Sequence, residues 1–400
     1  MKIGVIFEGN LSSGGGFQQA LNTVLLFSEK KTNDREFVFF TTNHENLKDL
    51  GQKGIEAHFF RINRLQRWII RARRHIRLNR LCEKLGLRNA FDRVFESHDI
   101  DILYFASATG LALLTERYNY IYTVWDLCHR DHPEFPEVRG SREFEAREEM
   151  LKQALPKATA VLADSSLGKE NLVRRYNLDP ERVRVLPFSP ATSTDISEED
   201  YQQGKINIRQ KYGVSNPYIY YPAQFWPHKN HIYILKALQY LNDNDGPEIS
   251  AVFSGSPGDS YEHVREQVDA LGLAKQVHFI GFAPNEEIPY LYRQSIALVM
   301  PTWFGPTNLP PLEAFRLGVP VLYPDLAGLR DQVGDAALLM DLQDPSSLAN
   351  HLTRLITEDN LTDTLRKKGK LRFKELDGQD RRKVIEEIFI DFAVKLNCWK

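Results

Sequence analysis

Short apolar runs alternate with longer amphipathic stretches along almost the whole chain. The runs are nearly continuous in Val, Ile, Leu, Phe and Tyr, as in IGVIF at residues 3–7 and YIYYPA at residues 218–223. Continuous apolar strands separated by helical periodicity are typical of parallel sheets that helices cover on both faces. The pattern therefore predicts an α/β protein with strands at 3–7, 36–42, 101–107, 120–126, 158–164, 183–187, 218–223, 249–255, 277–282, 296–301 and 320–324.

One polar segment divides this pattern into two halves. Residues 189–205, SPATSTDISEEDYQQGK, contain clustered acids and almost no aliphatic residues, as a linker does. A single core seldom grows beyond about 250 residues, and the chain has 400. We therefore predict two doubly wound domains, at 1–195 and 205–378. The chain ends in an amphipathic helix within 380–400, which we expect to pack back on the first domain.

The composition narrows the classes of function. A formal net charge of -2 provides no overall field that would attract nucleic acid. The three cysteines are scattered, which favours a reducing compartment over a disulfide framework. The chain begins directly with a strand pattern, and no run of about 18 apolar residues is present to cross a bilayer. We therefore expect a cytoplasmic protein whose membrane contact, if any, is peripheral.

The stretch PTWFGPTNLPPLEAFRLGVPVLYPD, residues 301–325, places polar residues where a strand ends and a helix begins. Ligands of doubly wound sheets bind beyond the carboxyl ends of the strands. Asn308 or Thr307 is placed to cap the helix, which would leave the amides around Thr307, Asn308 and Leu309 directed at a phosphate. Glu313 would repel that phosphate, but it can accept two hydrogen bonds from a vicinal diol such as ribose. An ordinary capped helix is the alternative.

Two further strand-to-helix loops carry candidate ligands of a phosphate. Lys229, in PAQFWPHKNH, lies at the positive end of a helix dipole, where a cation gains most if an anion is bound there too. Gly15 and Gly16, in the loop after the first strand, permit a close approach of the backbone. Their spacing does not match the GxGxxG fingerprint of dinucleotide binding. A solvated lysine and a plain glycine turn are the competing interpretations.

A fourth loop, TVWDLCHRDHPEFPEV, gathers titratable side chains behind a strand end. Asp126 ends the strand, and His129 follows it within a segment that proline interrupts. Zinc sites need closed ligand spacing such as two histidines on one helix face, which this loop lacks. We therefore predict a polar cleft wall here and no metal site.

At this point several motifs together resemble those of glycosyltransferase family 4, the retaining enzymes of the GT-B fold. FGPTNLPPLEAFRLGVPVLYPD resembles the signature loop of the family, commonly read as GFGLPPLEAMACGTPVV, and YIYYPAQFWPHKNHIYILKAL resembles its YVGRLxPRKN segment. Two more family segments are matched at 160–187 and 277–302. The likeness extends from about residue 120 to 350, and the N-terminal glycine loop agrees with it.

The resemblance implies two Rossmann-like domains that face each other across a cleft. The C-terminal domain would hold a nucleotide-diphosphate sugar and the N-terminal domain an acceptor. Lys229 matches the lysine on the diphosphate, with Asp126 and His129 as further catalytic candidates. The donor-binding candidates carried over are Glu313 on the ribose, the loop Thr307, Asn308 and Leu309, the base-flanking Gly281 and Phe282, the glycine loop Gly15 and Gly16, and Gln224 and Asn230 beside Lys229.

Three positions depart from the family pattern. The first signature glutamate of the family falls on Gly305, the arginine that usually precedes the lysine falls on Gln224, and the histidine of an "HD" pair falls on Trp125. These departures indicate either a subgroup with altered sugar contacts or a chain that has lost activity. Asp126 or His129 would then serve in place of the missing histidine.

The implied reaction is retaining transfer of a hexose or deoxyhexose without a metal or other cofactor. The nucleotide diphosphate leaves as an anion, and Lys229, the helix-start amides and the glycine loop would stabilise it. Same-face attack by the acceptor hydroxyl would retain the anomeric configuration. Two alternatives remain open: a catalytically silent nucleotide-sugar-binding protein and a sugar-nucleotide epimerase on the same fold.

The segment at residues 61–88, called the basic segment below, carries ten Arg and Lys residues against one acid. Its helical spacing predicts an apolar stripe of Ile62, Leu65, Ile69, Ala72 and Ile76, with Trp68 and Ile70 off the stripe. A basic amphipathic helix with exposed apolar residues suits peripheral contact with an anionic membrane surface. The acceptor would then be a lipid-linked saccharide, as in surface polysaccharide assembly. A packed helix with a solvated basic face is the alternative.

Overall fold

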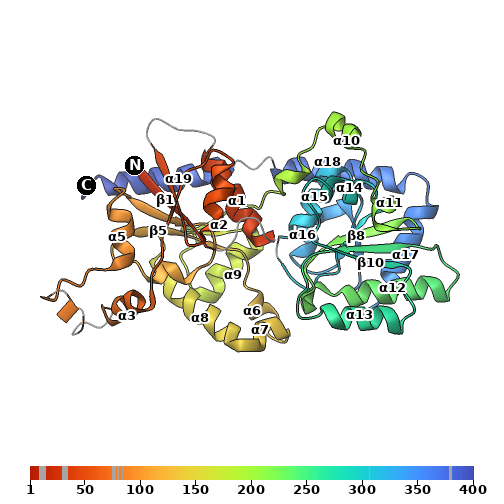
Figure 1. The fold of residues 1–400 in the computed structure, drawn as a ribbon, viewed down its shortest axis with the longest axis horizontal. Helices are drawn as coiled ribbons and strands as arrows, with labels where there is room; N and C mark the ends of the chain where they lie inside the picture. The colour runs from red at the N-terminus through yellow and green to blue at the C-terminus, as the bar shows by residue number, and fades with distance from the viewer. Residues whose placement is uncertain are drawn as a thin grey trace. The chain divides into compact units, whose positions relative to one another are not determined.

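The computed structural model describes residues 1–8, 15–28, 35–73, 78, 81–82, 84–305, 307–377 and 381–400. The chain forms two compact units, each built around one parallel sheet (Figure 1). The first unit contains Met1–Leu127, Glu145–Pro187 and Asp380–Lys400, and the second contains Cys128–Phe144 and Phe188–Gln379.

The sheet of the first unit has seven strands among the described residues, in the order β3-β2-β1-β4-β5-β6-β7. All of the pairings are parallel. From β1 the chain builds β2 and β3 on one side and then crosses to β4, so the strand order reverses between β1 and β4. The strands are β1 (Lys2–Phe7), β2 (Glu36–Thr41), β3 (Ala57–Phe59), β4 (Ile102–Phe105), β5 (Asn119–Val124), β6 (Ala160–Ala163) and β7 (Val183–Val185).

Helices cover both faces of this sheet because its strands are apolar on both sides. The helices are α1 (Gly15–Ser28), α2 (Glu45–Gly51), α3 (Arg64–Arg73), α5 (Ala90–Glu96), α8 (Glu143–Ala154), α9 (Ser166–Tyr176) and α19 (Arg381–Leu396). One core joins α5, α8 and α9 to the sheet. The other joins α1 to the C-terminal helix α19, drawn in blue in Figure 1, where Phe389 lies 6.3 Å from Phe27 between ring centroids.

The sheet of the second unit is also parallel, with six described strands in the order β10-β9-β8-β11-β12-β13. Its strand order reverses between β8 and β11. The strands are β8 (Tyr218–Pro222), β9 (Ser250–Ser254), β10 (Val277–Gly281), β11 (Leu298–Val299), β12 (Val321–Pro324) and β13 (Ala337–Met340).

The second unit contains two short helices from residues 128–144 and further helices that surround a single buried core. They are α6 (Cys128–Asp131), α7 (Pro136–Arg139), α10 (Glu198–Gly204), α11 (Ile208–Tyr212), α12 (His231–Asp243), α13 (Tyr261–Ala270), α14 (Ile288–Arg293), α15 (Leu309–Leu317), α16 (Leu329–Val333), α17 (Pro345–Thr357) and α18 (Leu361–Asp377). Strand β8 is rich in tyrosine, and its hydroxyls find partners: Tyr218 donates to the Leu291 carbonyl at 2.9 Å, and Tyr221 to the Lys229 carbonyl at 2.8 Å.

The fold class predicted from the apolar pattern is confirmed, since each unit is a doubly wound, Rossmann-like sheet. Strands β3 and β13 were not predicted, because both are short and lack a continuous run of β-branched or aromatic residues. The division into units also differs from the predicted ranges in two places. Residues 128–144 and 188–195 belong to the second unit, because their contacts lie with it.

Helix α3, the described helix of the basic segment, packs with a different face from the predicted one. Leu65 is 66% exposed although the stripe included it, whereas Ile70, expected off the stripe, is only 1% exposed. Ile62 is buried but precedes the helix, so it does not share the helical phase of the stripe. Trp68 is 66% exposed. Ile76 lies outside the described residues.

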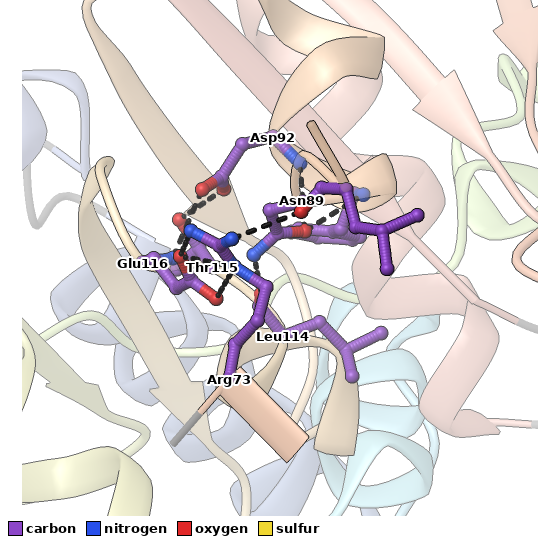
Figure 2. A network of polar contacts seen from close by, with 8 residues as sticks. Arg73, Asn89, Asp92, Leu114, Thr115 and Glu116 are labelled. Carbon is purple, nitrogen blue, oxygen red and sulfur yellow. Dashed lines mark hydrogen bonds and ion pairs between the residues drawn. The ribbon is translucent and has the colours of Figure 1, made fainter. Parts of the chain in front are cut away.

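Arg73 explains this orientation, because it is tied to the body of the first unit (Figure 2). Its guanidinium donates to both carboxylate oxygens of Glu116, at 2.9 and 3.0 Å, and to the Leu87 carbonyl at 2.9 Å. Glu116 is itself held, since its amide donates to Asp92 at 3.1 Å. A bidentate arginine pair of this kind fixes geometry as well as charge. Arg73 is therefore a structural residue of the basic segment.

Candidate functional site

The candidate site lies in the second unit, in the loops that follow two neighbouring strands. Strand β8 leads to Lys229, and β11 leads to the start of α15. The strand order reverses between these strands, and ligands of open α/β sheets bind at such a point. The two loops are joined directly, because the Trp303 amide donates to the His228 carbonyl at 2.9 Å. The structure therefore brings the Lys229 loop and the helix-start loop together.

The Lys229 loop has a fixed backbone. Residues Pro227–Lys229 form a single 3-10 turn, and Asn230 then takes the left-handed conformation with φ 55° before α12 begins. The Tyr221 hydroxyl donates a hydrogen bond to the Lys229 carbonyl. Gln224 accepts a hydrogen bond from the Trp226 indole at 2.8 Å. These contacts preset the position of the Lys229 backbone at the positive end of α12.

Two glycines that the sequence analysis did not single out allow this loop to pack closely. A side chain at Gly255, just after β9, would meet the Ala223 carbonyl oxygen at 2.4 Å, and one at Gly258 would meet that of Phe225 at 2.5 Å. Gly255 also has φ 149°, a conformation that favours glycine. The signal was present in the sequence, because SGSPG follows a predicted strand.

The start of α15 differs in one respect from the prediction. Asn308 occupies the N-cap position, but its side chain makes no capping hydrogen bond. Its amide donates to the Gln332 Oε1 at 3.1 Å, and its side chain donates to the Tyr323 hydroxyl at 2.6 Å. The Asn308 amide is therefore bound to Gln332 from α16 and is not directed at a phosphate. Its side chain makes no capping bond because Pro310 and Pro311, at the positions that a cap would bind, carry no N–H. Thr307 is half-buried and Leu309 is buried.

Glu313 lies in the interior of this site and is only 8% exposed. The Tyr292 hydroxyl donates to its Oε2 at 2.7 Å, and the Ala191 amide approaches its Oε1 at 3.4 Å. Burial raises the pKa of Glu313 above its ordinary value of 4.5, and these two hydrogen bonds only partly oppose the shift. The carboxylate is thus held in an environment that disfavours its charge, which is typical of functional carboxylates.

Gly305, where the family glutamate is missing, has a backbone conformation that other residues rarely adopt. Its φ is 118°, and a Cβ atom there would approach the Asn308 Oδ1 to 2.8 Å. The Asn308 side chain donates to the Gly305 carbonyl at 3.0 Å. The loop backbone at residue 305 therefore has a conformation that favours glycine. The position lacks the family carboxylate for this reason as well as by sequence.

An acid–histidine pair next to Lys229 was not predicted. The Glu137 Oε1 lies 2.5 Å from the His228 Nδ1 and accepts from the His228 amide at 3.1 Å. The His228 ring stacks on Phe304, with centroids 3.9 Å apart. Burial raises the pKa of Glu137, but the hydrogen bonds from His228 and from its own backbone amide outweigh burial and lower the pKa below 4.5. Spacing could not reveal this pair, because 91 residues separate its members.

The other candidates of the second unit lie at the end of β10. Gly281 is its last residue and takes φ 67°, which glycine permits. Phe282 follows it and is 61% exposed. The base-flanking role of Gly281 and Phe282 stays a prediction. Among the residues that the structure describes, no group of three or more His, Cys, Asp or Glu side chains is arranged to hold a metal ion.

The candidates near the end of β5 have different environments. Asp126 is held in the first unit by the Arg147 guanidinium, which donates to its Oδ1 at 2.7 Å. His129 is 0% exposed and packs edge-on against Phe144, with centroids 5.6 Å apart. The expected place of His129 in a cleft wall is therefore wrong, because its ring is enclosed in the interior. Gly15 and Gly16 are the first residues of α1.

Solved structures share this architecture over nearly the full chain. HepE from Anabaena, solved in complex with UDP-glucose, has a TM-score of 0.72 at 18% identity and covers 98% of this chain and 100% of its own. WaaG, described as a glycosyltransferase involved in lipopolysaccharide biosynthesis, has a TM-score of 0.66 at 15% identity and covers 97% of this chain and 98% of its own. The two Rossmann-like units thus define the GT-B class of fold.

Family models place the chain within that class. Glycosyl transferases group 1 matches residues 204–372, and Glycosyltransferase Family 4 matches residues 37–188. The chain therefore belongs to glycosyltransferase family 4.

Curated relatives match part of the chain. The O-antigen chain mannosyltransferase B of Escherichia coli is 24% identical over 246 residues, which are 61% of this chain and 64% of the relative. The D-inositol 3-phosphate glycosyltransferase of Corynebacterium glutamicum is 24% identical over 242 residues, 58% of this chain and 55% of the relative. The chain thus spans less than two thirds of the length of these relatives.

Proposed function

We propose that the protein is a glycosyltransferase that moves a sugar from a nucleotide-diphosphate sugar to a saccharide acceptor. The observation that carries this proposal is the meeting of the Lys229 loop with the loop that leads to Glu313, where the strand order of the second sheet reverses. A cation at the start of α12 suits a diphosphate, and an acid one turn into α15 suits a ribose diol. Family membership and the UDP-glucose complex of HepE support a nucleotide-sugar donor.

The chemistry requires a diphosphate to leave while positive charge builds at the anomeric carbon. Lys229 would offset the charge of the leaving group from a backbone position that Tyr221 and Trp303 already fix. The acceptor hydroxyl would attack from the same face as the leaving group, which retains the configuration. The transferred sugar would be a hexose or deoxyhexose, and the scheme uses no divalent metal.

Donor turnover in EDTA tests this scheme. The first step is a thermal-shift panel of nucleoside diphosphates and their sugars, because a ligand that binds the folded state raises its stability. The donor so identified is then incubated with the protein in EDTA, and nucleotide release is measured. We expect Lys229→Ala to slow release by about a hundredfold. Lys236→Ala removes an exposed lysine within α12, away from its first turn, and serves as the control. Complete dependence on added divalent ion would contradict the scheme.

A catalytically silent nucleotide-sugar binder is the second candidate, and Gly305 favours it. The loop lacks the family carboxylate, and its φ of 118° at Gly305 is one that residues with a side chain rarely adopt. A silent binder would give the same thermal shift as an enzyme but would release no nucleotide from its donor with any acceptor. The turnover measurement therefore separates the two functions.

The acceptor is proposed to be a lipid-linked saccharide at the inner face of a membrane, as in surface polysaccharide assembly. None of the described helices is both long and apolar enough to cross a bilayer. Helix α3 presents Leu65 and Trp68 to solvent beside Arg64 and Arg71, which are also exposed. Exposed apolar side chains among cations suit an anionic lipid surface. The names of the O-antigen relative and of WaaG support this class of pathway.

Vesicle binding tests the membrane contact. We expect salt-sensitive binding to anionic vesicles that Leu65→Ser and Trp68→Ser together weaken about tenfold or more, since each removes over 1 kcal/mol of apolar burial. Arg73 is unsuitable for this test, because its replacement would break the ion pair with Glu116. Tyr240→Ser, on an exposed aromatic of α12, is the matched control. Binding that high salt leaves unchanged would contradict the proposal.

A further inference from the structure

A pocket of about 740 Å³ opens in the first unit at the carboxyl ends of its strands. Its lining comes from the residues that directly follow β1, β2, β4 and β5 and from the end of β3 into α3. The strand order of this sheet reverses between β1 and β4, which places the pocket at the point where open α/β sheets bind ligands. The site just described lies in the other unit, so this pocket is a separate feature.

Two arginines give one part of the pocket its chemistry. Arg61 follows β3, and Arg67 lies in the first turns of α3. Both are exposed, and neither forms an ion pair with any carboxylate in the described part of the chain. The Arg67 Nε reaches only the Ile62 carbonyl, at 3.4 Å. Their guanidinium groups are therefore available, and planar guanidinium groups match the oxygens of a phosphate better than any other side chain.

The rest of the lining suits a sugar ring. Phe59 is 41% exposed, and the ring of His44 meets it edge-on at 5.4 Å. Glu8 is held in place as a hydrogen-bond acceptor, because the Thr109 hydroxyl donates to its Oε2. Thr109 is fixed in turn, since its amide donates to the Tyr122 hydroxyl at 2.8 Å. A carboxylate cannot help to bind a phosphate, but it can accept hydrogen bonds from sugar hydroxyls.

From this arrangement we propose that the pocket binds a sugar that carries a phosphate group, with Arg61 and Arg67 on the phosphate and Glu8 on the sugar hydroxyls. The inference rests on the proposed function in one respect: the bound sugar phosphate is the acceptor. The two arginines can only donate hydrogen bonds, and the Glu8 carboxylate can only accept them. Together they favour a ligand that carries both an anionic group and hydroxyls. A neutral saccharide would leave both guanidinium groups unused.

The phosphate has two possible sources, a lipid-linked sugar and a soluble sugar phosphate. Helix α3 contributes both to the pocket and to the face proposed to contact lipid. Arg67 lines the pocket, and the next residue, Trp68, is exposed on the face proposed to contact lipid. Successive helical residues are about 100° apart, so one short helix serves both surfaces. A phosphate that joins a sugar to a polyprenyl lipid would reach the pocket from the bilayer surface. A soluble sugar phosphate would reach it from solution.

Arginine-specific labelling tests the proposal on the full-length chain. Phenylglyoxal modifies exposed arginines, and peptide mapping by mass spectrometry reports the rate at each one. The soluble arm compares glucose 6-phosphate with glucose and with glucuronate. The membrane arm compares phosphatidylcholine vesicles with and without a polyprenyl phosphate. Arg93, exposed on α5 and outside the pocket lining, is the internal control.

We expect a phosphate-bearing probe, at about ten times its dissociation constant, to slow modification of Arg61 and Arg67 about tenfold while Arg93 is unaffected. Protection in the soluble arm identifies a sugar phosphate, and protection only by polyprenyl phosphate identifies a lipid phosphate. Equal modification in every arm overturns the proposal. Protection by glucose or glucuronate equal to that by the phosphate probes also overturns it.

The labelling result does not depend on donor chemistry. If the wild-type protein releases no nucleotide from any donor sugar while phosphate still protects Arg61 and Arg67, the proposed transfer is wrong and the sugar-phosphate site stands. If transfer proceeds and no phosphate probe protects these arginines, the function stands and the acceptor class is wrong.

Discussion

Glu313→Gln separates a binding role from a structural role for the buried acid of the second unit. The amide keeps the shape of the side chain and one acceptor oxygen, so the contact with Tyr292 survives. The raised pKa of Glu313 means that its ionised form is less stable in the folded protein than in water. Removing the charge therefore leaves the free energy of unfolding at pH 7 unchanged or increases it. Nucleoside diphosphate affinity should fall, because hydrogen bonds to a charged acceptor contribute about 1.5–3 kcal/mol, which is roughly 10- to 100-fold.

The pH dependence has a definite sign. A raised carboxyl pKa contributes stability when the group is protonated, and that contribution is lost as pH rises from 4.5 through the folded pKa. The advantage of Glu313→Gln over the wild type should therefore widen over this range. Nucleotide affinity of the wild type should instead weaken as pH falls through the same pKa, because a protonated acid accepts fewer hydrogen bonds.

Glu287→Gln is the matched control in the same unit. Glu287 is 3% exposed, but Lys211 binds it and the Tyr212 hydroxyl donates to its Oε2 at 2.7 Å. Burial raises its pKa, yet these contacts outweigh burial and lower it below 4.5. Its replacement should cost about 1.5–3 kcal/mol of stability and leave nucleotide affinity unchanged. Urea unfolding and titration calorimetry measure both quantities. A Glu313→Gln protein that loses over about 2 kcal/mol of stability and keeps its affinity would refute the reasoning.

Further predictions concern the two loops that meet at His228. Gly305→Glu, which restores the family residue, should destabilise the protein by about 1–3 kcal/mol in urea unfolding, because φ is 118° and the Asn308 side chain would have to shift. A stable and more active variant would show that the loop can accept the carboxylate. Glu137→Gln should lower stability at pH 7 and raise the donor KM, since the clamp on His228 loses its charge. The lowered pKa of Glu137 predicts that this stability difference disappears as pH falls from 4.5 through the folded pKa; a difference that persists at low pH would contradict it.

The sequence predicted the fold well because the signal is local. Near-continuous apolar strands such as Tyr218–Pro222 identify a parallel sheet by themselves. The places of Lys229 and Glu313 were predictable for the same reason, since both follow a strand and open a helix. Strand β3 was missed because AHF is too short to show a period, and the orientation of α3 depended on the ion pair between Arg73 and Glu116, which are 43 residues apart.

The environment of the site residues was not predictable from local pattern. The Asn308 amide was expected to face a phosphate, but Gln332 from another helix accepts its hydrogen bond. His129 looked like a cleft residue, but its ring is enclosed. The Glu137–His228 pair joins two loops that no motif relates. Each case depends on a contact between distant segments, and a single sequence contains no information on which segments meet.

The division of the chain between its two units has a consequence for synthesis on the ribosome. Helix α19 contributes Ile385, Phe389 and Phe392 to the core beneath β1, and it leaves the exit tunnel only after the whole second unit. The first unit therefore cannot close its core until α19 has emerged, whereas the second unit has all its strands available before α19 is synthesised. A nascent chain stalled at residue 379 should expose the apolar groove around Phe27 and Phe37, which makes this groove the expected point of contact for chaperones.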